Sequence, residues 1–109
     1  MKISIYEAAD EATALLKALA NRNRLLLLCQ LVEGERSVGE MAARLQLRES
    51  AVSQQLMLLR KDRLVAPRRD GQTIYYRLAS PAAAKVIETL YAIFCAEACA
   101  AADVTGGTG

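Results

Sequence analysis

Three cysteines are the most reactive side chains in this sequence, which contains no histidine. Cys29 lies in an apolar run, whereas Cys95 and Cys99 stand four residues apart and so on one face of a helix. Without histidine, most mixed nitrogen and sulfur metal sites are excluded, which leaves thiol chemistry of the three cysteines, with or without carboxylates, or a soft ion such as arsenite bound by three thiolates. The plainer interpretation makes each cysteine a small core hydrophobe, since reduced cysteine is among the most buried residues.

A second chemical pattern runs from Arg48 to Leu64, RESAVSQQLMLLRKDRL. Val52, Leu56 and Leu59 recur at helical spacing and make one apolar stripe. The opposite face carries short hydrogen-bonding side chains and almost no acid: Ser50, Ser53, Gln54, Met57 and Lys61. Serine, glutamine and lysine donate to phosphates, and glutamine also pairs with adenine in the major groove. The pattern is typical of a helix that enters DNA, although a solvated surface face would look similar.

The charge distribution favours a polyanionic partner for the middle of the chain. The net charge is only +2, but the segment from Arg44 to Arg77 holds eight basic residues against three acids. No apolar run reaches membrane-spanning length, and the N-terminus lacks the apolar core of a signal peptide, so we expect a cytoplasmic protein. No nucleophile with a neighbouring base and no phosphate loop is visible, so neither an enzyme, a cofactor nor a metal is predicted.

Caps and periodicity predict three helices before the stretch from Arg48 to Leu64. The first spans 6–20, and the second spans 22–33 with Asn21 as its N-cap and Gly34 as its left-handed stop. The apolar run LLLLCQLV predicts a second helix that is buried on most sides. Ser37 and Glu40 form a capping box for a third helix that ends near Leu45. A short break at 46–47 then gives a helix-turn-helix, with Arg48 at a weak N-cap position.

A β-hairpin follows this helix-turn-helix in the sequence. Residues 65–69 and 72–78 have strand character, and Asp70-Gly71 is a two-residue turn signal between them. Pro67 predicts that the first strand has a free edge. The side chains around the tip that could lie against a phosphate backbone or a minor groove are Arg68, Arg69 and Gln72.

The last helix is expected over 81–102, with Ser80 as its N-cap and Pro81 at its first position. Val86, Leu90 and Phe94 form one apolar stripe, and Ile87 and Tyr91 form another. Two apolar faces exceed what one small core requires, so we expect a dimer through the first and last helices rather than a single thick core contact. Residues 1–102 are predicted to form one DNA-binding and dimerisation domain, and residues 103–109 a disordered tail.

The predicted order is helix, helix, helix-turn-helix, hairpin and helix, which is a mostly α winged helix-turn-helix with a small β-hairpin. At this point the chain resembles the ArsR family of bacterial repressors over nearly everything from Ala14 to Cys95. The resemblance is carried by LLKALANRNRLLLLCQL, SVGEMAARL, SAVSQQLMLLRKDRLV and RRDGQTIYYRL. It implies a homodimer bound to double-stranded operator DNA, with two recognition helices about 34–36 Å apart in successive major grooves.

Within that family the chain looks like the sulfide- and persulfide-responsive branch, the BigR/SqrR type. The third helix, SVGEMAARL, lacks the cysteines of the metal-sensing branches, so the resemblance argues against zinc, nickel or cobalt sensing. It implies that Cys29 and Cys95 form a redox-sensing dithiol that reactive sulfur species such as persulfide or polysulfide bridge. The bridge would release the operator, and Cys99 would be a bystander or a resolving thiol.

These observations lead to one leading hypothesis and two rivals. The first is a dimeric repressor that senses reactive sulfur. Its expected DNA contacts are Arg48, Ser50, Ser53, Gln54, Gln55, Lys61, Arg68, Arg69 and Gln72. The second keeps DNA binding but makes the inducer arsenite or another soft metal bound by Cys29, Cys95 and Cys99. The third is a helical interaction module that does not bind DNA, for which affinity for DNA would be absent or independent of salt.

Overall fold

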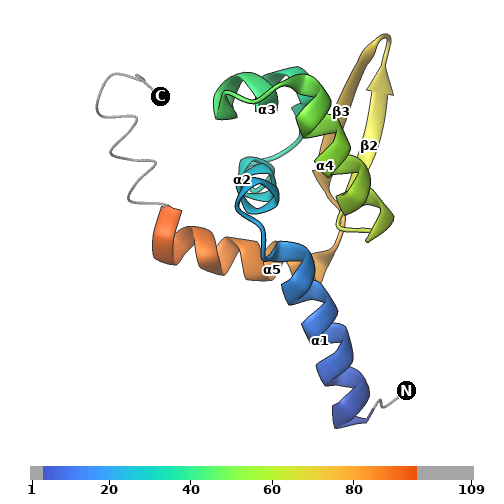
Figure 1. The fold of residues 1–109 in the computed structure, drawn as a ribbon, viewed down its shortest axis with the longest axis vertical. Helices are drawn as coiled ribbons and strands as arrows, with labels where there is room; N and C mark the ends of the chain where they lie inside the picture. Colours follow the sequence, from blue (N-terminus) through green and yellow to red (C-terminus); the bar gives the residue numbers. More distant parts are fainter. Residues whose placement is uncertain (1–3, 96–109) are drawn as a thin grey trace.

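The computed structural model describes the backbone of residues 4–95 and the side chains of residues 4–94. Figure 1 shows helices arranged around α2, with a long hairpin rising beside α4. The elements in order are α1 (Ile5–Leu19), α2 (Arg22–Gln30), β1 (Arg36–Ser37), α3 (Val38–Leu45), α4 (Glu49–Lys61), β2 (Val65–Asp70), β3 (Thr73–Leu78), α5 (Pro81–Leu90) and the π-helix η1 (Tyr91–Cys95). This order confirms the predicted winged helix-turn-helix.

The helix α1 projects away from the rest of the molecule in Figure 1. The side chain of Ser4 accepts a hydrogen bond from the Glu7 amide and so caps its first turn. Leu19 is its one buried residue. A helix with so little burial within its own chain gains little stability from packing there.

The helix α2 begins as predicted but ends sooner. The Asn21 side chain accepts a hydrogen bond from the Arg24 amide at 3.0 Å, which confirms the N-cap. The helix stops at Gln30 rather than at residue 33, and Gly34 follows with a φ of +141°. Leu27 and Leu28 are fully buried, but Leu26 is 36% exposed. The expectation of burial on most sides is therefore confirmed, and the side that carries Leu26 is open to solvent.

The helix-turn-helix has the predicted core and a left-handed turn. Ser37 and Glu40 make both hydrogen bonds of the capping box at the start of α3. Gln46 adopts a left-handed φ of 56° and turns the chain toward α4, where a glycine is more usual. Val52, Leu56 and Leu59 are fully buried, so the apolar stripe of α4 is confirmed. The helix ends at Lys61 rather than at Leu64.

The hairpin belongs to a three-stranded antiparallel sheet with the order β1-β3-β2. The short strand β1 was missed because two residues carry no period that a sequence could reveal. Pro67 lies in β2, which is the edge strand as predicted. The turn consists of Gly71 and Gln72 rather than of Asp70 and Gly71, since Asp70 still pairs with Thr73. Gly71, with a φ of +64°, takes the first turn position, as a type II′ turn requires.

The last helix begins as predicted, with the Ser80 side chain accepting from the Ala83 amide and Pro81 in the first turn. It changes to a π-helix at Tyr91, and residues 96–102 of the predicted helix, like the predicted tail, lie outside the described residues. Ala83 and Ile87 join the single core, which α2, α3, α4 and the sheet complete. Among the described helices, none combines the length and the apolar character needed to cross a membrane.

Candidate functional site

The exposed face of α4 is formed by side chains that the buried stripe forces outward. Ser50, Gln54, Met57 and Lys61 are exposed, and Ser53 is half-buried. Within the described part of the chain, Ser50, Gln54 and Lys61 make no side-chain hydrogen bond or ion pair. Their donors and acceptors are therefore available to another molecule. Met57, which is 66% exposed, adds an apolar surface of the kind that contacts a thymine methyl group.

The start of α4 is also left open toward solvent. Arg48 occupies the N-cap position with an extended backbone and makes no side-chain cap hydrogen bond, as the sequence predicted. The first amides of a helix have no partner within the helix, and the positive end of the helix dipole favours an anion there. An exposed arginine beside these amides suits a DNA phosphate.

Gln55 differs from its neighbour Gln54. Its side chain is half-buried, and its Oε1 atom is buried with no hydrogen-bond partner among the described residues. In this position the oxygen is shielded from solvent. Of the two glutamines predicted to contact DNA, Gln54 therefore has the accessible side chain.

The hairpin of β2 and β3 is the wing of this fold, and its two arginines, Arg68 and Arg69, have different surroundings. Arg68 makes a two-pronged ion pair with Glu35, with N–O distances of 2.7 to 3.1 Å, and stacks 4.7 Å from the centre of the Tyr75 ring. The hydrogen bond from Arg68 lowers the pKa of Glu35, and the same bond raises the pKa of Arg68. Arg69 and Gln72 are exposed and have no such partner in the described residues. Arg68, which the sequence predicts to contact DNA, thus has a guanidinium that already binds Glu35.

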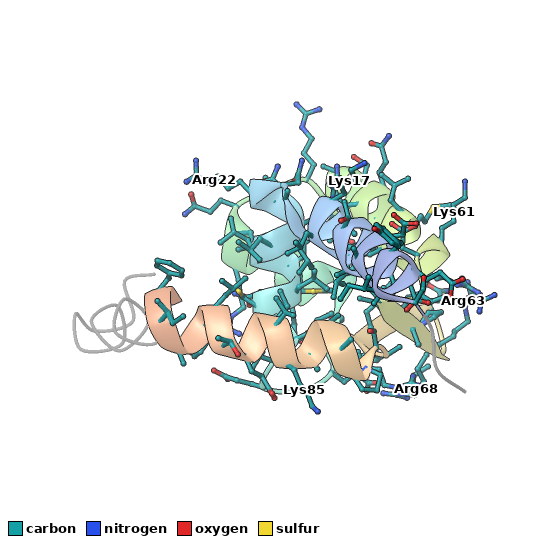
Figure 2. All side chains as sticks on the ribbon, turned by 90° about the horizontal axis from the view of Figure 1, so that it is seen from below. Lys17, Arg22, Lys61, Arg63, Arg68 and Lys85 are labelled. Carbon is teal, nitrogen blue, oxygen red and sulfur yellow. The ribbon has the colours of Figure 1, made fainter. Side chains whose placement is uncertain are left out.

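Other basic side chains also divide into those that have an internal acceptor and those that have none among the described residues. Arg44 donates to the side-chain oxygen of Gln30 at 3.2 Å, whereas Lys61 and Arg63 are exposed. Figure 2 shows Lys61 and Arg63 extending outward near the end of α4. Arg63 has a left-handed φ of 62°, a conformation that strains any residue with a Cβ atom. The cationic surface is therefore smaller than the charge count alone indicates.

Cys29 lies in the last turn of α2, half-buried against the core. The helix α2 contacts α5, and the π-helix that continues α5 ends at Cys95. The side chain of Cys95 and all of Cys99 lie outside the described residues, so the pairing of Cys29 with Cys95 stays a prediction. Among the described side chains, no group of three cysteine or carboxylate residues is arranged to hold a metal ion.

Comparison with known proteins identifies the family. Residues 21–66 match the family described as bacterial regulatory protein, arsR family. The chain is 52% identical over 93 residues to the biofilm growth-associated repressor of Agrobacterium fabrum, covering 85% of this chain and 80% of that protein. The chain belongs to the ArsR family. ArsR-family members of this kind are DNA-binding transcriptional regulators and not enzymes.

Two further ArsR-family proteins are similar in sequence and structure. HlyU of Vibrio cholerae, a transcriptional activator, is 47% identical over 85 residues, covering 78% of this chain and 79% of HlyU. Its reduced form has a TM-score of 0.81 and 44% identity, covering 84% of this chain and 96% of that chain. The homodimeric winged helix-turn-helix domain of Mb0332 from Mycobacterium bovis has a TM-score of 0.70 and 33% identity, covering 84% and 86%.

Proposed function

We propose that this ArsR-family protein is a homodimeric repressor whose two α4 helices enter successive major grooves of an operator. The observation that carries the DNA-binding part is the exposed face of α4, held in place by three fully buried residues on its other side. Ser50 and Gln54 contact base edges, and Arg48, Lys61 and Arg69 contact phosphates. Repression follows the name of the Agrobacterium relative, whereas HlyU is named as an activator.

Exposed apolar side chains on the first and last helices support the dimer. Ile5, Tyr6 and Leu16 of α1 are 78%, 80% and 59% exposed, and Phe94 in the π-helix is 70% exposed. A groove between α1, the end of α4 and the start of α5 is lined by Ala8, Ala12, Leu15, Leu58 and Leu64 among others. Burying these surfaces against a second copy would supply the packing that α1 lacks in its own chain. Mb0332 is a homodimer of the same fold.

The dimer can be tested by sedimentation velocity. The wild-type protein is expected to sediment as a dimer at micromolar concentration, and Leu16→Glu to shift it toward the monomer. The matched control is Ala43→Glu, which adds the same single negative charge at an exposed position of α3, outside the proposed interface. A monomeric wild-type protein, or a dimer unaffected by Leu16→Glu, would contradict the proposed interface.

The proposed signal is a reactive sulfur species that bridges Cys29 and Cys95. With hydrogen trisulfide as donor, the Cys29 thiolate bonds to the middle sulfur, breaks one S–S bond and releases hydrosulfide. The Cys95 thiolate then bonds to the same sulfur and displaces a second hydrosulfide. The two cysteines are oxidised, the outer sulfur atoms are reduced to sulfide, and one sulfur stays in the bridge. The position of Cys29 on a helix that packs against α5 supports this proposal, because the chain continues from α5 to Cys95.

The sensor is tested by DNA binding and mass together. A DNA duplex selected from random sequence by the reduced protein serves as operator, and sodium tetrasulfide serves as donor. Wild-type protein is expected to lose affinity on treatment and to gain a bridge between Cys29 and Cys95 in peptide mass spectra. Cys29→Ser is expected to bind the duplex in the reduced state and to ignore the donor. Polysulfide release of the Cys29→Ser variant equal to that of wild type would reject the dithiol mechanism.

Cys99 distinguishes a two-cysteine bridge from a three-thiolate soft-ion site. Cys99→Ser is expected to leave the polysulfide response intact, because the proposed bridge uses only two thiols. Loss of an arsenite response in the same variant, together with no response of the wild type to polysulfide, would instead favour three-coordinate binding of the soft ion.

A further inference from the structure

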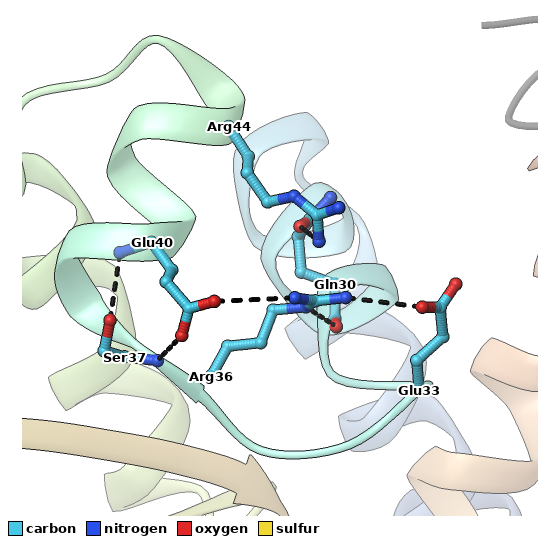
Figure 3. Close-up of polar contacts among 6 residues, drawn as sticks. All are labelled: Gln30, Glu33, Arg36, Ser37, Glu40 and Arg44. Carbon is cyan, nitrogen blue, oxygen red and sulfur yellow. Dashed lines mark hydrogen bonds and ion pairs between the residues drawn. The ribbon is translucent and has the colours of Figure 1, made fainter. Parts of the chain in front are cut away.

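The end of α2 is held to β1 and α3 by hydrogen bonds from two arginines (Figure 3). Gln30, the residue after Cys29, is the last residue of α2. Its backbone carbonyl accepts from Nε of Arg36 at 2.9 Å, and its side-chain oxygen accepts from Arg44 at 3.2 Å. The last carbonyls of a helix lack partners within the helix, so these contacts satisfy groups that would otherwise need solvent. The turn that carries Cys29 is thereby attached at two points, to β1 through Arg36 and to α3 through Arg44.

Arg36 connects this carbonyl to the start of the helix-turn-helix. Its guanidinium lies 3.7 Å from a carboxylate oxygen of Glu40 and 3.3 Å from one of Glu33, and its side chain is only 18% exposed. The other oxygen of Glu40 accepts from the Ser37 amide at 3.1 Å, and the Ser37 hydroxyl accepts from the Glu40 amide at 3.0 Å. One arginine therefore contacts both the end of α2 and the carboxylate that caps α3.

The backbone at Arg36 is fixed from the other side as well. Arg36 pairs with Tyr76 in the antiparallel ladder between β1 and β3. Because Tyr76 is buried in the core, the backbone of Arg36 has little freedom to follow a movement of α2. A displacement of the last turn of α2 must therefore break or stretch the bond between the Gln30 carbonyl and Arg36. The arginine can then move onto the carboxylate of Glu40, which changes how α3 is capped.

We propose that Arg36 is the positioning residue that couples the state of Cys29 to the helix-turn-helix. This inference rests on the thiol function proposed above, and it names the contact through which that function reaches α3 and α4. In the reduced protein, the Gln30 carbonyl keeps the guanidinium of Arg36 from moving fully onto Glu40, while the capping box and the pairing of β1 with β3 hold α3 in the arrangement that binds the operator. When Cys29 is bridged, the last turn of α2 follows the bridge, Arg36 loses the Gln30 carbonyl, and α3 is repositioned.

The experiment measures a coupling factor, the Kd for the selected duplex after sodium tetrasulfide divided by the Kd of the reduced protein. Allosteric couplings commonly amount to about 5- to 150-fold. Arg36→Met is expected to bring the factor close to one while the bridge still forms, as checked by mass. The reduced variant is expected to bind the duplex within about threefold of wild type, because Arg36 does not lie on the DNA-binding face. A purely structural role would weaken binding in both states and leave the factor unchanged.

Glu33→Gln is the matched control, since it removes one exposed ion pair of Arg36 and keeps the Gln30 and Glu40 contacts. Its coupling factor is expected to equal that of wild type. Should Arg36→Met fail to fold, Arg36→Lys decides, because lysine keeps the charge but lacks the fork that spans a carbonyl and two carboxylates. A wild-type factor in a folded, bridged Arg36 variant overturns the role of Arg36 alone. If wild-type protein neither forms the bridge nor releases DNA, the thiol function and this inference both fall.

Discussion

The exposed face of α4 and the junction between α2 and α3 carry the same kinds of side chain and use them in opposite ways. At the junction, Gln30 accepts from two arginines, and Ser37 is part of a complete capping box. On α4, Ser50 and Gln54 are exposed and make no side-chain hydrogen bond within the described residues. Serine, glutamine and arginine therefore indicate DNA contact only where the fold leaves their polar atoms without internal partners.

The same contrast divides the basic residues. Arg44 and Arg68 belong to the basic segment by sequence, but their guanidinium groups bind Gln30 and Glu35. Arg48 and Arg69 are exposed and have no side-chain partner among the described residues. A guanidinium that already has an acceptor has fewer N–H donors left for a phosphate, and pairing with a carboxylate also offsets its positive charge.

Gln54→Ala should have the largest effect on DNA binding and almost none on folding. Loss of a base contact typically costs about 1–3 kcal/mol, so operator affinity is expected to fall by about 5- to 150-fold. Because the side chain is exposed and unbonded, the free energy of unfolding should change by less than about 0.5 kcal/mol. Fluorescence anisotropy with the selected duplex and urea unfolding measure the two quantities.

Gln30→Ala, at the junction between α2 and α3, should show the opposite balance of effects on stability and DNA binding. It removes the acceptor of Arg44, so it is expected to lower the free energy of unfolding by about 1 kcal/mol. The direct loss of operator affinity should be much smaller than for Gln54→Ala, since Gln30 does not lie on α4. If Gln54→Ala destabilised the fold more than Gln30→Ala did, the distinction between the two regions would fail.

The sequence predicted well those features that depend on residues close together in the chain. The caps at Asn21 and Ser37 depend on residues three positions apart, and the buried stripe of α4 depends on helical period. The pairing of Arg68 with Glu35 joins residues 33 positions apart, and no period or spacing encodes it. The sequence therefore placed Arg68 on the DNA surface, because its partner comes from the loop that leads into β1.

Two other features also have long-range causes. The run LLLLCQLV is apolar all round, but Leu26 is 36% exposed because the elements of one chain do not enclose α2. The buried oxygen of Gln55 follows from how α4 packs against its neighbours, whereas the sequence gives Gln54 and Gln55 equal standing. The sequence thus does not show which of the predicted DNA contacts have accessible polar atoms, because that depends on packing and on distant partners.

The caps of α3 and α4 give the next test of the comparison, with an expected effect of about 1 kcal/mol. Ser37→Ala removes a complete capping box and should lower the free energy of unfolding by about that amount. Arg48→Ser places a capping hydroxyl where α4 has none, so it should raise the free energy of unfolding while weakening operator binding. Urea unfolding and DNA titration of both variants measure this. A lower free energy of unfolding for Arg48→Ser than for wild type would show that Arg48 stabilises α4 in a way that its exposed side chain does not suggest.

The two wing arginines should differ in how they affect the salt dependence of DNA binding. Each phosphate contact contributes about 0.9 to the slope of log K against log salt concentration. Arg69→Ala is expected to reduce the slope by about that amount per contact, and Arg68→Ala to leave it unchanged. Titrations of the selected duplex over a range of salt concentrations provide the slopes. An equal reduction in Arg68→Ala would mean that the ion pair with Glu35 opens when DNA binds.

The smallest expected effect is the pH dependence of that ion pair. The hydrogen bond from Arg68 holds the pKa of Glu35 below its ordinary value, so the contribution of Glu35 to stability is present above the pKa of the unfolded chain. It is lost as the pH falls through the lowered pKa of the folded protein, and not as the pH rises. NMR titration of the Glu35 side-chain carbonyl should show that pKa returning toward the ordinary range in Arg68→Met. Because Glu35 is ionised throughout the neutral range, operator binding near pH 7 should be insensitive to this titration, and a wing that changed its DNA contacts there would need another titrating group.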